Sequence, residues 1–308
     1  LVTVAAPAGA DVLVGVGANA TNKVTGVIAE QYNISPSTVN GGDVVVNVPS
    51  QVVPPEAPGI FIPQDSKYTS DFTYNVGTAS TAAHLPPNGA GAGKTALLND
   101  ATAGTGFIDF GRQSSQRANT DPASLEYYAW ALDAVSWVKF PGNPITNLTQ
   151  QDLINIWTCD AGSKLPIYSD WSQIPGSTFS GSIVKYQAQL SSGRQKTFEQ
   201  LVLNGHPIDE NCDASHLSTR LFESNASGVA PATKARAIFF YGYSSYQSQS
   251  KSFTPNLRNG ATFGQLNGVT LTPGVINETA QRFPGTQYLY NIADTRSPSY
   301  DRVIAFLG

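Results

Sequence analysis

Short apolar runs alternate with amphipathic segments along most of the chain. The first apolar run, residues 11–16, leads into a glycine turn, and residues 21–32 then place apolar side chains three to four positions apart. A strand, a glycine turn and a helix in this order predict an α/β opening. Residues 33–87 differ, because they carry many prolines, two short β-like runs (43–48 and 72–76) and no helical period, which predicts an extended excursion.

The same patterns predict elements further along the chain. Buried strands are expected at 106–111, 180–186 and 237–241. Helices are expected at 95–100, 148–157 and 195–203.

Three longer-range expectations follow from these elements. The strongly apolar stretch 125–140 is expected to cross between two lobes, and the strand 237–241 to return the chain to the first lobe. In the tail, Asn267-Gly268 and Pro284-Gly285 predict hairpin turns.

Glycine-rich junctions stand where the predicted helices begin. The most prominent runs from Asn88 to Leu98 and is built of glycine and alanine up to Lys94. Small residues let the backbone turn tightly, and the first N–H groups of a helix have no intrahelical acceptor. Such a junction can hold an anion without a net charge on the protein. Similar junctions occur at 15–21 and 191–195, so the sequence indicates one oxyanion site approached by three loops.

The composition acts mainly by exclusion. The chain has 308 residues, 41% of them hydrophobic and only 13% charged, with a net charge of −4. This length suffices for two lobes with separate cores. No cluster of lysine and arginine could follow a phosphate backbone, which argues against nucleic acid as a partner. No apolar run approaches the about 20 residues of a membrane span.

Cys159 and Cys212 are the only cysteines, and the sequence contains no methionine. Two cysteines in a polar, lysine-poor chain favour one disulfide in an exported protein, with two buried thiols as the alternative. Neither cysteine has a partner at metal-ligand spacing, so no metal site is expected. We expect a processed chain that has lost a signal peptide and is secreted, held at the cell surface or periplasmic.

The central glycine-rich junction allows several interpretations. Residues 88–95 miss the nucleotide-binding P-loop pattern by one position, since Asn88 stands where the first glycine belongs. Lys94 and Thr95 would then contact phosphates and magnesium. Two prolines precede the loop in place of a buried strand, which argues against an NTPase. A structural glycine turn and a loop for an anion or polar solute both remain open.

The strand predicted at 106–111 delivers Arg112, Ser114 and Ser115 at its carboxyl end, where open α/β sheets place ligands. A guanidinium and two hydroxyls suit a phosphate-like group. The alternative for Arg112 is an ordinary salt bridge, and the same two interpretations apply to residues 191–194.

Enzymatic motifs are missing. His84, His206 and His216 lie near no Gly-x-Ser-x-Gly elbow, no His-Glu-x-x-His occurs, and each histidine is expected to be a surface or cap residue. Carboxylate pairs for glycoside hydrolysis are left open, because their separation is a three-dimensional property. We therefore expect a protein that is not an enzyme and needs no cofactor.

The order of these loops resembles the PstS-like phosphate-binding proteins of the periplasmic binding protein type II superfamily, closest to secreted actinobacterial-type members. The similar segments, in family order, are 15–21, 88–94, 108–115, 147–157, 191–198, 267–273 and 283–291. The resemblance spans nearly the whole chain. It implies an α/β fold of two lobes, with mixed sheets flanked by helices and a ligand cleft between the lobes. Lobe I would comprise 1–133 plus 236–308, and lobe II 134–235.

The resemblance also implies a set of ligand-binding residues. These are Asn19, Thr21, Ala90, Gly91, Arg112 and Ser114 in the first lobe, with Ser192, Gly193 and Arg194 in the second. The chain departs from the family at Ala18, Ala90 and Arg194, where hydroxyl residues are usual, and at Ser191, where glycine is usual. Each lost hydroxyl removes a hydrogen bond of about 0.5–1.5 kcal/mol. Arg194 would either compensate for the lost hydrogen bonds with its own charged donors or fill the cleft.

Two functions follow as hypotheses. In the first, the protein captures phosphate or a related oxyanion between its lobes for the permease of an ABC transporter. In the second, the binding-protein scaffold has become a surface or assembly component with a degenerate cleft, and the protein self-associates.

Overall fold

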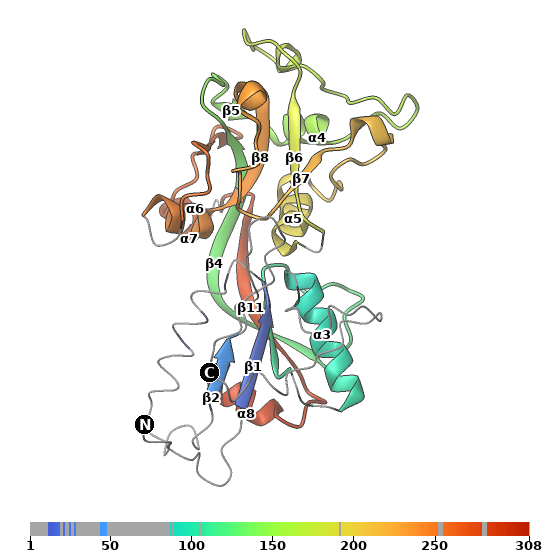
Figure 1. Cartoon of the computed structure of the whole chain (residues 1–308), viewed down its shortest axis with the longest axis vertical. Coiled ribbons are helices and arrows are strands. Elements are labelled where there is room, and N and C mark those ends of the chain that lie inside the picture. The colour runs from blue at the N-terminus through green and yellow to red at the C-terminus, as the bar shows by residue number, and fades with distance from the viewer. Residues whose placement is uncertain are drawn as a thin grey trace. The chain divides into compact units, whose positions relative to one another are not determined.

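The computed structural model describes residues 12–18, 21, 25, 28, 44–47, 87, 89–104, 106, 108–190, 192–251, 255–278 and 282–307. The chain divides into two compact units (Figure 1). Unit 1 comprises Leu1–Ala131 with Leu289–Gly308, and unit 2 comprises Leu132–Tyr288. The boundary that follows Ala131 falls inside one long strand, β4 Leu125–Lys139.

Unit 1 is built on a mixed sheet with the strand order β2-β1-β3-β11. Its elements are β1 Val12–Gly17, β2 Val44–Asn47, β3 Phe110–Gln113, β11 Thr286–Asp294, α3 Ala90–Ala103 and α8 Tyr300–Leu307. β1 pairs in parallel with both β2 and β3, and β11 pairs antiparallel with β3. Side chains alternate along β1, so Leu13 packs with Val303 of α8 while Val14 packs with Leu97 of α3.

In unit 2 the strand order is β4-β8-β6-β7, and β9 pairs antiparallel with β4. Besides β4, the strands of unit 2 are β5 Asn147–Leu148, β6 Val184–Ala188, β7 Thr219–Leu221, β8 Ala237–Gly242, β9 Thr262–Phe263 and β10 Gln265–Leu266. Its α-helices are α4 Gln150–Trp157, α5 Gly193–Thr197, α6 Tyr243–Ser250 and α7 Pro273–Asn277. Short 3-10 helices are η1 Trp171–Gln173, η3 Ala214–His216 and η4 Pro231–Arg236, and a π-helical segment, η2 Phe198–Val202, continues α5.

The core of unit 2 is aromatic. Trp157 of α4 makes an edge contact with Phe198, and Phe198 stacks on Phe240 of β8 with ring centroids 4.6 Å apart. All three side chains are buried. Because β8 is buried along its whole length, it reads in the sequence as an unbroken apolar run rather than an alternating one.

Several expected elements are confirmed. β1 and β2 occupy the runs predicted near residues 11–16 and 43–48, and the described residues of the segment 21–32, namely Thr21, Thr25 and Ile28, are helical. The second β-like run, 72–76, lies outside the described residues. At Asn267-Gly268 both residues have positive φ, and Leu266 and Val269 exchange backbone hydrogen bonds across the turn.

Three predictions need correction. The helix predicted at 95–100 begins at Ala90, because the glycine- and alanine-rich segment forms the first helical turn itself. The strand predicted at 106–111 is displaced to Phe110–Gln113, so Arg112 lies on the strand rather than after it. β8, expected to return the chain to the first lobe, belongs to unit 2, because it pairs with β4 and β6. Unit 2 thus extends to Tyr288.

Candidate functional site

In unit 1 the turn after β1 is held close to β3. Gly17 has φ 116°, and a Cβ there would lie 2.5 Å from the carbonyl oxygen of Arg112, so only glycine fits. The next amide, that of Ala18, donates to the same carbonyl at 2.9 Å. Thr21 is fully buried, and its hydroxyl donates to the carbonyl of Ala18 at 3.3 Å. Asn19, expected beside Thr21 in the ligand set, lies outside the described residues.

The N-terminus of α3 reaches this turn. A Cβ on Gly93 would lie 2.5 Å from Cα of Gly17, so glycine at this position lets the helix approach the end of β1. The N-cap, Gly89, has φ 90° and supplies no side-chain cap, and the first turn carries no acidic residue. The first helical hydrogen bond runs from the amide of Gly93 to the carbonyl of Gly89, so the amides of Ala90 and Gly91 precede it.

The two residues that a P-loop would use have other contacts. Lys94 forms an ion pair of 2.6 Å with Asp121, and the hydroxyl of Thr95 donates to the carbonyl of Gly91 within the helix. Asp121 also accepts from the hydroxyl of Tyr127 and from the amide of Ala118. These contacts fasten α3 to the segment that precedes β4.

Arg112 is buried beneath the β1 turn. Its Nη1, Nη2 and Nε donate to the carbonyls of Gly15 at 3.0 Å, Gly17 at 3.1 Å and Ala18 at 3.4 Å. Burial lowers the pKa of Arg112 to about 9, so the guanidinium remains charged at neutral pH. These bonds hold the backbone turn in place.

The residue next to Arg112 reaches the second loop. Gln113 donates from Nε2 to the carbonyl of Ala90 at 2.7 Å, which connects β3 to the first turn of α3. Ser114, which follows β3, is buried. The structure therefore brings Thr21, Arg112 and Ser114 to the same end of β1 and β3 as the α3 N-terminus.

In unit 2 the loop before α5 is built around Glu223. Ser192 is the N-cap of α5, accepts from the amide of Gln195 at 3.1 Å, and donates from its hydroxyl to Glu223. Nε of Arg194 donates to the other carboxylate oxygen of Glu223 at 3.3 Å. The predicted loop of Ser192, Gly193 and Arg194 is thus organised about a carboxylate of the protein itself.

Arg194 has further partners. Its Nη1 contacts Asp133 of β4 at 3.0 Å, and its Nη2 donates to the hydroxyl of Ser245 at 3.4 Å. The side chain is fully buried. Burial alone would lower the pKa of Arg194, but the charges of Asp133 and Glu223 outweigh it and raise the pKa above its ordinary value.

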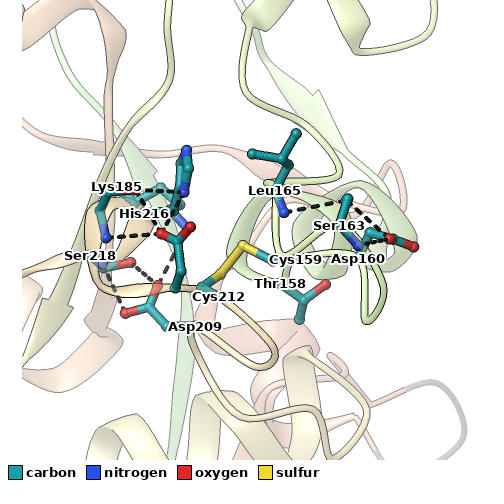
Figure 2. Close-up of a disulfide and its surroundings, with 12 residues drawn as sticks. Thr158, Cys159, Asp160, Ser163, Leu165, Lys185, Asp209, Cys212, His216 and Ser218 are labelled. Atoms are coloured by element: carbon teal, nitrogen blue, oxygen red, sulfur yellow. Dashed lines mark hydrogen bonds and ion pairs between the residues drawn. A yellow bond between two sulfur atoms is a disulfide. The ribbon is translucent and has the colours of Figure 1, made fainter.

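The predicted disulfide is confirmed. Cys159, just after α4, is bonded to Cys212, with a sequence separation of 53 residues (Figure 2). The amide of Cys159 also donates to the carbonyl of Glu210 at 2.9 Å. Figure 2 shows Asp209, Ser218 and Lys185 beside the disulfide. The bond therefore ties the chain after α4 to the loop that carries Asp209.

The remaining polar candidates lie at the surface. His206 and His216 pair with Glu210 at 2.6 Å and Asp213 at 2.8 Å in exposed or half-exposed positions, as expected, while His84 lies outside the described residues. In the part of the chain that the structure describes, no group of histidine, cysteine and acidic residues is arranged to hold a metal ion. No helix within that part is long and apolar enough to cross a membrane.

The sequence analysis missed the residues that engage the predicted basic side chains. Asp121, Asp133 and Glu223 lie 27, 61 and 29 positions from the residues they pair with. No local motif marks any of them, since each pairing exists only once the strands are assembled.

Comparison of the structure with solved structures gives consistent results. A phosphate transport receptor from Vibrio cholerae has a TM-score of 0.59 at 16% sequence identity, with 96% of this chain and 93% of that chain covered. A putative phosphate ABC transporter substrate-binding protein from Clostridium perfringens, solved with bound phosphate, has a TM-score of 0.54 at 14% identity, with 96% and 92% covered. PstS from Borrelia burgdorferi has a TM-score of 0.50 at 15% identity, again with 96% and 92% covered.

Comparison by sequence adds no relative: no protein-family model matches the chain, and the search of curated proteins finds no match. At these identities the structural similarity concerns the fold. The fold is PstS-like, and the α/β class expected from the sequence is confirmed.

Proposed function

We propose that this protein is a solute-binding protein that captures phosphate or a related oxyanion and passes it to the permease of an ABC transporter. It acts outside the cell, at the cell surface or in the periplasm, and it binds its ligand without making or breaking covalent bonds. The similar folds of the Vibrio and Clostridium proteins support this proposal, because their names assign them to phosphate transport.

The observation that carries the proposal is the N-terminus of α3. This helix of 14 residues begins without a side-chain cap and without an acidic residue in its first turn. By contrast, α4 begins with a complete capping box of Thr149 and Asp152. The partial positive charge at the start of α3 is thus met neither by a side-chain cap nor by an acidic residue of the first turn, which supports an anion there. The helix begins at the carboxyl ends of the parallel strands β1 and β3, where α/β sheets place ligands.

Titration calorimetry of phosphate tests the proposal. The protein is first unfolded and refolded to remove any carried ligand, and sulfate serves as a second titrant. We expect phosphate to bind with a Kd of about 1 µM or tighter. The diagnostic variant is Ala92→Asp, which places a carboxylate in the first turn of α3. Helices tolerate an acidic side chain well at this end.

The expected effect is at least about a tenfold loss of phosphate affinity, because two like charges about 4 Å apart repel by several kcal/mol in a partly screened site. Ala92→Asn is the matched control, since it has the same shape without the charge. Equal affinities of the two variants would show that the anion does not bind at this helix.

The second hypothesis, a scaffold protein with a degenerate site, is favoured by one specific observation. Ser192 and Arg194, which should face the ligand from the second unit, bond to Glu223 and Asp133 instead. If the chain works in this way, phosphate produces no heat and the protein self-associates in sedimentation velocity experiments. A monomer that binds phosphate would contradict this alternative.

A further inference from the structure

Unit 2 contains a pocket of its own, apart from the α3 N-terminus of unit 1. Its volume is about 480 Å³, which lies in the range of pockets that hold small molecules. The pocket is lined by side chains of β6 and the residues that follow it, of β7 and the residues that precede it, and of the helical segment 195–199. Asp209, from the loop that ends at the disulfide-bonded Cys212, also lines the pocket (Figure 2).

Both carboxylates of the pocket are saturated by the protein. Asp209 accepts from Ser218 through its amide at 2.8 Å and its hydroxyl at 2.7 Å, from Gln187 at 2.8 Å, and from Lys185 at 3.3 Å. Glu199 pairs with Lys196 at 3.2 Å. Each negative charge is therefore balanced by a lysine, so the wall presents no excess of negative charge to a ligand.

Glutamine amides supply much of the remaining polar lining. Gln187 links Asp209 to Gln195, whose Nε2 donates to Gln187 at 3.3 Å and to Glu199 at 2.9 Å. Gln189 accepts at Oε1 from the amide of Glu223 at 2.6 Å. These partners fix which end of each amide is oxygen and which is nitrogen.

One atom on each of two amides is left over. Within the described part of the chain, Nε2 of Gln189 and Oε1 of Gln195 have no hydrogen-bond partner, although both atoms are buried. A buried donor or acceptor without a partner costs free energy. A hydroxyl group both donates and accepts, so it is the ligand group that matches a leftover N–H donor and a leftover C=O acceptor together.

The rim of the pocket adds an apolar surface. Leu190 is 70% exposed and Leu217 is 54% exposed, and both line the pocket. Exposed leucines beside amides and hydroxyls suit a molecule that has C–H faces as well as hydroxyl edges. Each charged side chain in the lining is engaged by the protein: Lys196 pairs with Glu199, Asp209 pairs with Lys185, and Arg220 donates from Nη1 to the carbonyl of Ala188 at 2.9 Å.

We propose that this pocket of unit 2 binds a neutral, hydroxyl-rich small molecule of the size of a mono- or disaccharide. Such a ligand would meet the glutamine amides with its hydroxyls and the two rim leucines with its C–H faces. The pocket is lined by side chains of unit 2 alone, among them Ser192 of the expected oxyanion set, whereas the proposed oxyanion site is tested at α3 of unit 1.

Ligand-observed NMR and calorimetry with a defined sugar panel test the proposal. The probes are glucose, galactose, N-acetylglucosamine, maltose and trehalose, with inorganic phosphate as a charged competitor. The diagnostic variant is Leu217→Trp, which fills the mouth of the pocket from an exposed position without removing a hydrogen bond. The matched control is Leu165→Trp, since Leu165 is 52% exposed in the same unit and does not line the pocket.

We expect at least one sugar to bind saturably, with an affinity at least tenfold lower in Leu217→Trp and unchanged in Leu165→Trp. Phosphate should not compete with it. Absence of binding by every sugar at millimolar concentration would overturn the proposal, as would equal affinities in the two variants. Phosphate binding that Leu217→Trp weakens would show an anion pocket instead. Because Ala92→Asp reports on α3 and Leu217→Trp on this pocket, either proposal can fail alone.

Discussion

Position 242 needs glycine to leave space for another side chain, not to adopt an unusual backbone angle. Its φ of −79° and ψ of 142° suit any residue. A Cβ at this position, however, would lie 1.2 Å from Nη1 and 1.8 Å from Cζ of Arg194. The guanidinium cannot move aside cheaply, because it is buried and paired with Asp133 and Glu223. The missing side chain of Gly242 at the end of β8 thus makes room for the guanidinium of Arg194 on α5.

Gly242→Ala should therefore lower the free energy of unfolding by about 2–5 kcal/mol, through overpacking and displacement of Arg194 from its carboxylates. Gly274→Ala is the control in the same unit, since Gly274 is exposed and the nearest atom to a Cβ there is 3.7 Å away. Urea unfolding followed by circular dichroism measures both. If the two variants unfold at the same urea concentration, Arg194 is not held as tightly as its contacts indicate.

At the scale of elements, helix starts show what local sequence reveals. The capping box of α4 lies within four adjacent residues, so the helix 148–157 was predictable to within two residues of its observed start at Gln150. The start of α3 was predicted five residues too late, because a run of glycine and alanine reads as a loop unless the strand it packs against is known. Position 93 needs glycine, because a Cβ there would lie 2.5 Å from Cα of Gly17 at the end of β1.

The ion pair of Lys94 with Asp121, which fastens α3, should make the stability of the protein depend on pH. Burial raises the pKa of Asp121, but the hydrogen bonds from Lys94, Tyr127 and Ala118 outweigh it, and the pKa lies below its ordinary value. A carboxyl with a lower pKa in the folded state contributes stability above its unfolded pKa of about 4, and this contribution is lost as pH falls toward the folded pKa.

Asp121→Asn should accordingly reduce the free energy of unfolding by about 1–3 kcal/mol at neutral pH, because it removes a charge that accepts three hydrogen bonds. The difference from the unaltered protein should shrink as the pH falls below about 4. Chemical unfolding across this pH range measures it. Asp301→Asn serves as the control, since Asp301 is exposed in the first turn of α8 of the same unit. A difference that stays constant with pH would contradict the assigned role.

At the scale of the whole molecule, the fold was far more predictable than the site. Apolar runs mark β1 and β8 because burial acts on every residue of a strand. The partners of Arg194 left no such mark, since Asp133 and Glu223 belong to distant parts of the chain and meet only through the pairing of β4 with β8 and of β6 with β7. The position of β8 in unit 2 escaped prediction for the same reason, because strand order is a property of the assembled sheet.

The disulfide offers a test of how independent the units are. It closes a loop of 53 residues inside unit 2, and the chain-entropy model assigns it about 4 kcal/mol. Replacing both cysteines (Cys159→Ser with Cys212→Ser) should therefore destabilise the segments that the bond joins, 158–168 and 206–218. Because the bond lies entirely in unit 2, helix α3 of unit 1 should keep its protection.

Amide hydrogen exchange read by mass spectrometry separates these regions in one experiment. Faster exchange is expected in the two joined segments, with unchanged exchange in α3. The unaltered protein in reductant should reproduce the pattern, and the serine variant should not respond to reductant. Equal loss of protection in α3 would show that the two units unfold as one. Unchanged exchange everywhere would show that the hydrogen bond from Cys159 to Glu210 and its neighbours hold this loop without the covalent link.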